Sequence, residues 1–84
     1  MAKIEQVPNP NAPVPSRNKF KCHVRYSSDR SKAMADILQY DEDAEFKICG
    51  DWSFKVKTTL SLNDMNRIMI YRDRMTNVKK TWFF

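Results

Sequence analysis

Residues 19–26 of the chain, Lys-Phe-Lys-Cys-His-Val-Arg-Tyr, alternate between cationic or polar side chains and apolar ones. Because successive side chains of a β-strand point to opposite faces of its sheet, this alternation predicts a strand with one apolar and one basic face. The inward residues are then Phe20, Cys22, Val24 and Tyr26, and the outward residues are Lys19, Lys21, His23 and Arg25.

Two later stretches show the same two-residue period. Residues 52–60 place Trp52, Phe54, Val56 and Leu60 on one side and Lys55 and Lys57 on the other, and residues 44–48 place Lys47 outward, with Glu45 as the one acid. If these strands share one sheet with a single buried side, its solvent side is a dense cationic surface. We expect that surface to be the functional one.

The second and third strands form a predicted hairpin. The register that agrees with the pattern pairs Ile48 with Trp52, Phe46 with Phe54 and Ala44 with Val56, around a loop of residues 49–51. All six side chains then share one face, and a slip by one residue would destroy that agreement. Gly50, the one glycine of the chain, falls in the loop, where a positive φ costs it least.

Two helices are predicted from residues that recur at helical spacing. Ser27, Ser28 and Asp29 supply the start of the first, which runs to about Gln39. Its apolar face comprises Ala33, Met34, Ile37 and Leu38, with Asp29, Lys32, Asp36 and Gln39 opposite. The second helix begins at Ser61, which forms a capping box with Asp64, and its apolar face comprises Leu62, Met65, Ile68 and Met69. Asn77 is a predicted stop, and the acidic run from Asp41 is a predicted solvated loop.

The last segment, residues 78–84, fits two structures. As a continued helix it extends an apolar stripe through Tyr71, Met75, Val78 and Trp82. As a strand it buries Val78 and Trp82, together with Phe84, and turns Lys79, Thr81 and Phe83 outward. Aromatic residues and threonine favour the strand.

The resulting order is strand, helix, strand, strand, helix, strand. It predicts an α+β fold, a small ferredoxin-like β-α-β-β-α-β sandwich with an antiparallel sheet of order 4-1-3-2 and both helices on one face. This single domain spans residues 19–84, and residues 1–18, which hold all four prolines, form a flexible arm rich in proline and asparagine. Trp52, Phe54, Phe46, Phe20 and Trp82 are the expected core, and Trp52→Ala is expected to cost about 3–5 kcal/mol.

Composition and motifs favour a binding protein over an enzyme. The net charge of +5 suits an anionic partner. One glycine excludes a glycine-rich phosphate loop, His23 lacks an orienting carboxylate, and Cys22 and Cys49 are expected to be free thiols without metal-ligand spacing. We therefore expect no catalytic residue, no metal, no cofactor and no small-molecule substrate.

The same residues bear on location and family. No apolar run of membrane-spanning length and no signal peptide is evident, so a cytoplasmic protein without a membrane partner is expected. RNA-recognition motifs share the predicted topology, but they stack bases on outward aromatic residues of the central strands, and here Phe83 is the one outward aromatic candidate. The pattern therefore supports membership of no family.

Two functions follow from the basic surface. The first is a small non-catalytic protein that contacts nucleic-acid phosphates. The alternative is a regulator or inhibitor, of phage-type proportions, that docks its basic face on an acidic or nucleic-acid-binding surface of a larger enzyme. For either partner the predicted binding residues are Lys19, Lys21, His23, Arg25, Lys47, Lys55, Lys57 and Lys79, with Phe83 as a possible aromatic anchor. Neither function fixes the oligomeric state.

Overall fold

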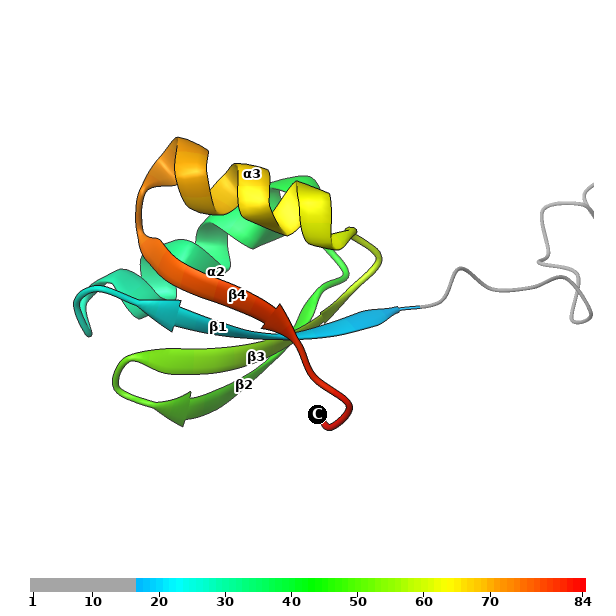
Figure 1. Ribbon diagram of the computed structural model, residues 1–84, viewed down its shortest axis with the longest axis horizontal. Coiled ribbons are helices and arrows are strands. Elements are labelled where there is room, and N and C mark those ends of the chain that lie inside the picture. Colours follow the sequence, from blue (N-terminus) through cyan, green and yellow to red (C-terminus); the bar gives the residue numbers. More distant parts are fainter. Residues whose placement is uncertain (1–16) are drawn as a thin grey trace, which may run out of the picture.

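The computed structural model describes residues 17–84. Its elements are β1 (Asn18–Val24), α2 (Asp29–Tyr40), β2 (Glu45–Gly50), β3 (Ser53–Thr58), α3 (Leu62–Arg72) and β4 (Met75–Lys80). The strands form one antiparallel sheet in the order β2-β3-β1-β4, which confirms the predicted topology. Both helices cover the same face of the sheet and leave the other face open (Figure 1).

The predicted arm, residues 1–18, lies outside the described residues except for its last two. Asn18 is already part of β1, so the domain begins before the predicted boundary at residue 19. The Asn18 side-chain amide donates to the Leu60 carbonyl at 2.9 Å, and the Arg17 guanidinium bonds to the Glu45 carboxylate and the Asp43 carbonyl. The two residues are therefore tied to the domain.

The core lies between the sheet and the two helices. It is built from alternate residues of the strands and from one face of each helix: Phe20, Cys22, Val24, Ala33, Ile37, Phe54, Val56, Met65, Ile68, Met75 and Val78. The inward parity predicted for β1 is confirmed up to Val24, whereas Tyr26 lies beyond the strand and is exposed. The alternation of β1 and β3 therefore decides which side of the sheet is buried.

The hairpin departs from its predicted register. Ile48 pairs with Phe54 and Phe46 with Val56, a shift of two residues, and a bulge follows Ile48. Because side chains alternate with a period of two, this shift keeps every residue on its predicted face. Trp52, however, moves into the turn and is 56% exposed, so its predicted place in the core is wrong. Gly50 ends β2, and its φ is not positive.

The first helix buries an unexpected acid. Asp36 was predicted on the solvent side of α2, yet it is buried and Leu38 is exposed. The Arg74 Nη1 atom donates to both carboxylate oxygens of Asp36 at 2.9 Å, which satisfies the buried charge. The cap also differs, because the Ser28 side chain makes no capping hydrogen bond.

The second helix begins as predicted and ends earlier. Ser61 and Asp64 form the capping box, which is confirmed. The helix ends at Arg72, and Asp73 adopts a left-handed conformation with φ 56° that turns the chain into β4 at Met75. Asn77 is therefore a strand residue, and its predicted role as a helix stop is wrong.

The last strand is right in type but displaced. Val78 is buried, but β4 ends at Lys80, and Trp82 is 89% exposed where burial was predicted. Phe20 pairs with Lys80, so Lys19 and Asn18 of β1 lie where residues 81 and 82 would continue the pairing. The Thr81 N–H still donates to the Lys19 carbonyl, but the chain bends at Trp82, and residues 83 and 84 lie past the end of β1.

Candidate functional site on the open face of the sheet

A row of four lysines crosses the whole sheet on its open face. The pairing register places Lys79 of β4 opposite Lys21 of β1, Lys21 opposite Lys55 of β3, and Lys55 opposite Lys47 of β2. We call these four residues the lysine row. Neighbouring strands lie about 4.8 Å apart, so the row spans about 14 Å. The two central lysines are half-buried and the two outer ones are exposed.

The row is electrostatically unfavourable for the isolated domain. Like charges directly opposite each other on neighbouring strands destabilise a sheet. The ion pairs found within residues 17–84 are formed by arginines, and none includes a lysine of the row. The repulsion is therefore not relieved by acids in the described domain, and an anion from outside would relieve it.

A second pair of lysines lies beside the row. Lys19 is opposite Lys57, two positions along β1 and β3 from Lys21 and Lys55. Lys57 also faces Glu45, but the Glu45 carboxylate is bonded to the Arg17 guanidinium. The structure thus places the six predicted lysines on one face.

His23 and Arg25 are placed differently. His23 lies between Ser53 and Asn77, on the same face and next to the row. Its Nδ1 atom is enclosed and has no hydrogen-bond partner within residues 17–84. Arg25 lies beyond β1, past an irregularity between His23 and Val24, and its Nη2 atom is 3.4 Å from the Asp73 carboxylate. The sequence predicted Arg25 to be an outward strand residue of this face, and that placement is wrong.

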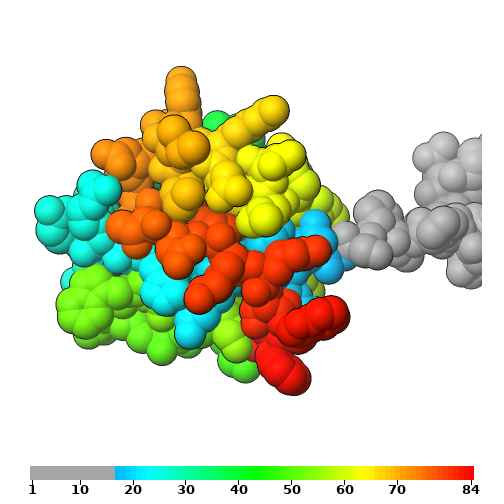
Figure 2. Space-filling model, in the orientation of Figure 1, coloured from blue at the N-terminus to red at the C-terminus, as the bar shows by residue number. Residues whose placement is uncertain are grey.

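The last four residues follow β4, and the strand pattern placed Phe83 outward correctly but Trp82 inward wrongly. The Thr81 N–H donates to the Lys19 carbonyl at 2.9 Å, and the Phe84 ring lies 4.9 Å from the Lys57 Nζ atom. Trp82 and Phe83 are exposed, and Figure 2 shows this end of the chain (red) projecting from the domain beside its first described residues (blue). A hollow of about 270 Å³ there is lined by Arg17, Asn18, Lys19, Lys80, Thr81 and Trp82.

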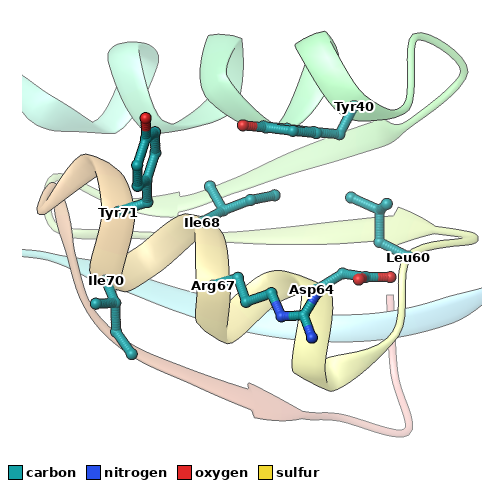
Figure 3. Close-up of a pocket in the computed structure, with 7 residues that line it drawn as sticks. All are labelled: Tyr40, Leu60, Asp64, Arg67, Ile68, Ile70 and Tyr71. Atoms are coloured by element: carbon teal, nitrogen blue, oxygen red, sulfur yellow. The ribbon is translucent and has the colours of Figure 1, made fainter.

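A larger hollow lies on the helix side of the molecule. Its volume is about 700 Å³, and Figure 3 shows Tyr40 from the end of α2, Leu60 from the loop before α3, and Asp64, Arg67, Ile68, Ile70 and Tyr71 from α3. The Asp64 carboxylate accepts the Ser61 N–H of the capping box. Asp64, the acid of this hollow, is therefore engaged in capping α3. The hollow and the lysine row lie on opposite sides of the sheet.

Two ionisable groups are shifted by their surroundings. Burial raises the pKa of the Cys22 thiol to about 12, which keeps it protonated and unreactive. The Thr58 hydroxyl lowers the pKa of Asp41 by a hydrogen bond of 2.5 Å, with smaller help from the Thr59 and Asp43 N–H groups and from Arg17, against the opposing effect of burial. Asp41 was predicted to be a solvated acid of its loop, but its carboxylate accepts hydrogen bonds within the fold. Cys22 and Cys49 are free thiols, as predicted.

Within residues 17–84, no three or more histidine, cysteine, aspartate or glutamate side chains are grouped so that they could hold a metal ion. None of the helices there has the length and apolar character needed to cross a membrane. Comparisons with protein-family models, with curated protein sequences and with solved structures find no match to this chain.

Proposed function

We propose that this protein is a small non-catalytic binding protein that contacts the phosphates of a nucleic acid through its lysine face. The lysine face is the open side of the sheet with its six lysines, Lys19, Lys21, Lys47, Lys55, Lys57 and Lys79. The observation that carries the proposal is the lysine row, in which Lys47, Lys55, Lys21 and Lys79 are aligned without an intervening acid. A sheet gains nothing in stability from such an alignment. A polyanion laid across the row would relieve the repulsion and release its own counterions.

The length of the row suits a nucleic-acid backbone. One strand of B-DNA carries a phosphate about every 3.4 Å along the axis, so the row of about 14 Å matches roughly four phosphates. Contacts of this kind give position and affinity without base specificity. With Lys19 and Lys57 included, about six phosphate contacts predict a slope of log K against log salt of about −4 to −5.

An acidic surface of a larger protein is the alternative partner of the same face. Charge complementarity would speed that association and fix its register, as in a regulator or inhibitor. The uniform sign along the row favours nucleic acid, because protein surfaces usually intersperse both signs. For either partner, the cytoplasm is the proposed place of action.

The test compares two pairs of charge-neutralising substitutions. Lys21→Gln with Lys55→Gln removes the centre of the row, and Lys32→Gln with Arg67→Gln removes the same charge from exposed positions on the two helices. Binding of a fluorescein-labelled oligonucleotide is measured by anisotropy over a series of salt concentrations. We expect the first pair to weaken binding at least about tenfold and to reduce the slope by about 2, and the second pair to change little.

Three results would contradict the proposal. They are the absence of binding at low salt, equal losses for both pairs, and a slope near zero. If, after nuclease treatment, affinity purification returns one stoichiometric protein that the Lys21/Lys55 variant fails to retain, and the oligonucleotide does not bind, the partner is the acidic protein surface instead.

A further inference from the structure

We infer that the nucleic acid is single-stranded and that its bases stack on Trp82 and Phe83. This inference rests on the proposed function and adds to it the class of strand that the lysine face takes. Both rings belong to the C-terminal tail, residues 81–84.

The tail is attached to the sheet at both of its ends, first through its backbone and then through a lysine of the open face. At the start, the Thr81 N–H donates to the Lys19 carbonyl at 2.9 Å. At the end, the Phe84 ring lies 4.9 Å from the Lys57 Nζ atom, within the range of a cation–π contact. Because Lys19 and Lys57 are themselves paired, both attachments are made to one place on the sheet.

The two aromatic side chains between these attachments are turned to solvent. Trp82 is 89% exposed and Phe83 is 76% exposed. The Phe83 N–H donates to the Thr81 hydroxyl at 3.4 Å, a long bond that closes a local turn. The tail backbone is thus attached while its largest apolar surfaces remain uncovered. An exposed aromatic pair of this kind indicates a binding surface.

Cations lie beside Trp82, the first ring of the aromatic pair. Lys19 and Lys80 line the hollow beside Trp82, together with Arg17, which is bonded to Glu45. The lysine row crosses β1 at Lys21, two residues from Lys19, a distance of about 7 Å. A strand whose phosphates follow the row therefore passes within reach of the rings. Aromatic side chains beside a basic groove are the elements with which proteins bind single strands.

Stacking on these rings requires bases that are free of a complementary strand. In a duplex each base face is covered by its neighbours, and the grooves expose only base edges. In a single strand the faces are open, and a ring accepts any base, so the binding is tolerant of sequence. The combination of a lysine row and two uncovered rings therefore selects a single strand over a duplex.

The experiment uses the full chain and two matched tryptophans. Trp82→Ala and Phe83→Ala are compared with Trp52→Ala, since Trp52 is also largely exposed but lies in the turn between β2 and β3. Each variant is titrated with a labelled oligothymidylate of roughly twelve nucleotides, a length within the usual range of single-strand sites, and with a duplex of equal length.

We expect Trp82→Ala and Phe83→Ala each to weaken oligothymidylate binding by roughly 5- to 150-fold, the range that corresponds to one base–aromatic stack. Their duplex affinity, and the oligothymidylate affinity of the Trp52→Ala variant, should stay within about twofold of the wild-type values. In a Trp52→Phe background, in which Trp82 is the one tryptophan, oligothymidylate should also quench the fluorescence.

The outcomes separate this inference from the proposed function. Unchanged oligothymidylate affinity in both tail variants, or tighter binding of the duplex, would overturn the stacking inference, and the proposed function would survive if Lys21→Gln with Lys55→Gln still weakens binding. If wild-type protein binds neither strand form at low salt, both fail. If the tail variants instead lose a nuclease-resistant protein partner, the rings anchor a protein and the inference is wrong.

Discussion

Lys21 of β1 and Lys55 of β3 lie directly opposite each other. On the other side of β1, Lys21 also faces Lys79 of β4, and on the other side of β3, Lys55 also faces Lys47 of β2. The two central lysines are half-buried residues, and charges on partly buried residues are screened less than those on exposed ones. The domain therefore carries an internal repulsion on the face that we propose as its binding surface. Binding surfaces commonly cost a protein some stability.

Neutralising one lysine of the row should therefore stabilise the free protein. Lys55→Gln removes two opposed contacts at once, and we expect the free energy of unfolding to rise by about 0.5–1 kcal/mol in low salt. Added salt should narrow the difference, because it screens the repulsion in the wild-type protein. Urea unfolding at two salt concentrations measures both effects, with Lys32→Gln on α2 as the control. An unchanged or lower stability of the Lys55 variant would show that the row is not strained.

The contact between Phe84 and Lys57 should position the tail more than it stabilises the domain. Phe84→Ala removes a cation–π contact and should cost no more than about 1 kcal/mol of unfolding free energy. Phe84→Tyr retains a ring face and should behave like the wild-type protein, whereas Phe84→Leu should behave like the alanine variant. Hydrogen exchange of the Thr81 N–H, which is bonded to Lys19, reports whether the tail is released. Equal protection in all three variants would contradict this role.

Local alternation predicted the strands and the face of each outward lysine, but it did not predict their alignment. A shift of the hairpin register by two residues leaves every side chain on the same face. The alternation therefore does not reveal the shift that aligns Lys47 with Lys55 and exposes Trp52. The register depends on the turn and on the bulge after Ile48, which periodicity does not describe. The sequence therefore predicted which lysines share a face, but not that four of them are aligned across the strands.

Two other features depend on partners far away in the chain. Asp36 is buried because Arg74, a neighbour only in the folded structure, supplies its counter-charge, and a helical pattern alone places an aspartate in solvent. Residues 83 and 84 lie past the end of β1 at Asn18 and have no partner in that strand, a limit that residues 81–84 alone do not reveal. Both errors come from reading one segment without its neighbour.

The hairpin provides a direct test of which aromatic residues form the core. Phe54 is fully buried and packs edge-on against Phe46 with ring centroids 5.9 Å apart, whereas Trp52 is largely exposed. Phe54→Ala should cost about 3–5 kcal/mol and Trp52→Ala less than about 1 kcal/mol. Thermal and urea unfolding measure both, with Phe54→Leu as a milder core change in case the alanine variant does not fold. A large loss for the Trp52 variant would contradict the observed register.

The buried ion pair between Arg74 and Asp36 should contribute more to the free energy of unfolding than the exposed pair between Arg25 and Asp73. Arg74→Met leaves the Asp36 carboxylate with one remaining ion-pair partner within residues 17–84, the Arg72 Nε atom at 3.9 Å. We expect a cost of about 1–3 kcal/mol, below the usual value for a buried pair because the Arg74 side chain is 37% exposed. Arg25→Met breaks the exposed pair with Asp73 and should cost no more than about 0.5 kcal/mol. Urea unfolding compares the two.

A second substitution tests the cause of that loss. If an uncompensated buried charge is responsible, Asp36→Leu combined with Arg74→Met should recover part of the stability that the single Arg74 substitution removes. Additive or greater loss in the double variant would show that the side chains act through packing instead.

The hydrogen bond between Thr58 and Asp41 should make part of the stability depend on pH. The folded-state pKa of Asp41 is lowered, mainly by the Thr58 hydroxyl, so the unfolded chain binds a proton more readily than the folded one. The associated stability is present above the ordinary aspartate value of 3.8 and is lost as the pH falls below it, through the folded-state pKa. Thr58→Val removes the donor and should cost about 1–2 kcal/mol near neutral pH, with a smaller cost in acid.

Thr59→Val is the matched control for this prediction, because Thr59 reaches Asp41 through its backbone N–H, which the substitution retains. Urea unfolding from about pH 6 to about pH 2 gives the difference in stability between each variant and the wild-type protein. For Thr58→Val that difference should shrink as Asp41 becomes protonated, and for Thr59→Val it should stay constant. The Thr58 hydroxyl also accepts the Leu60 N–H at 3.1 Å. If the stability difference for Thr58→Val does not change with pH, the cost comes from the loss of the buried hydroxyl itself and not from the charge of Asp41.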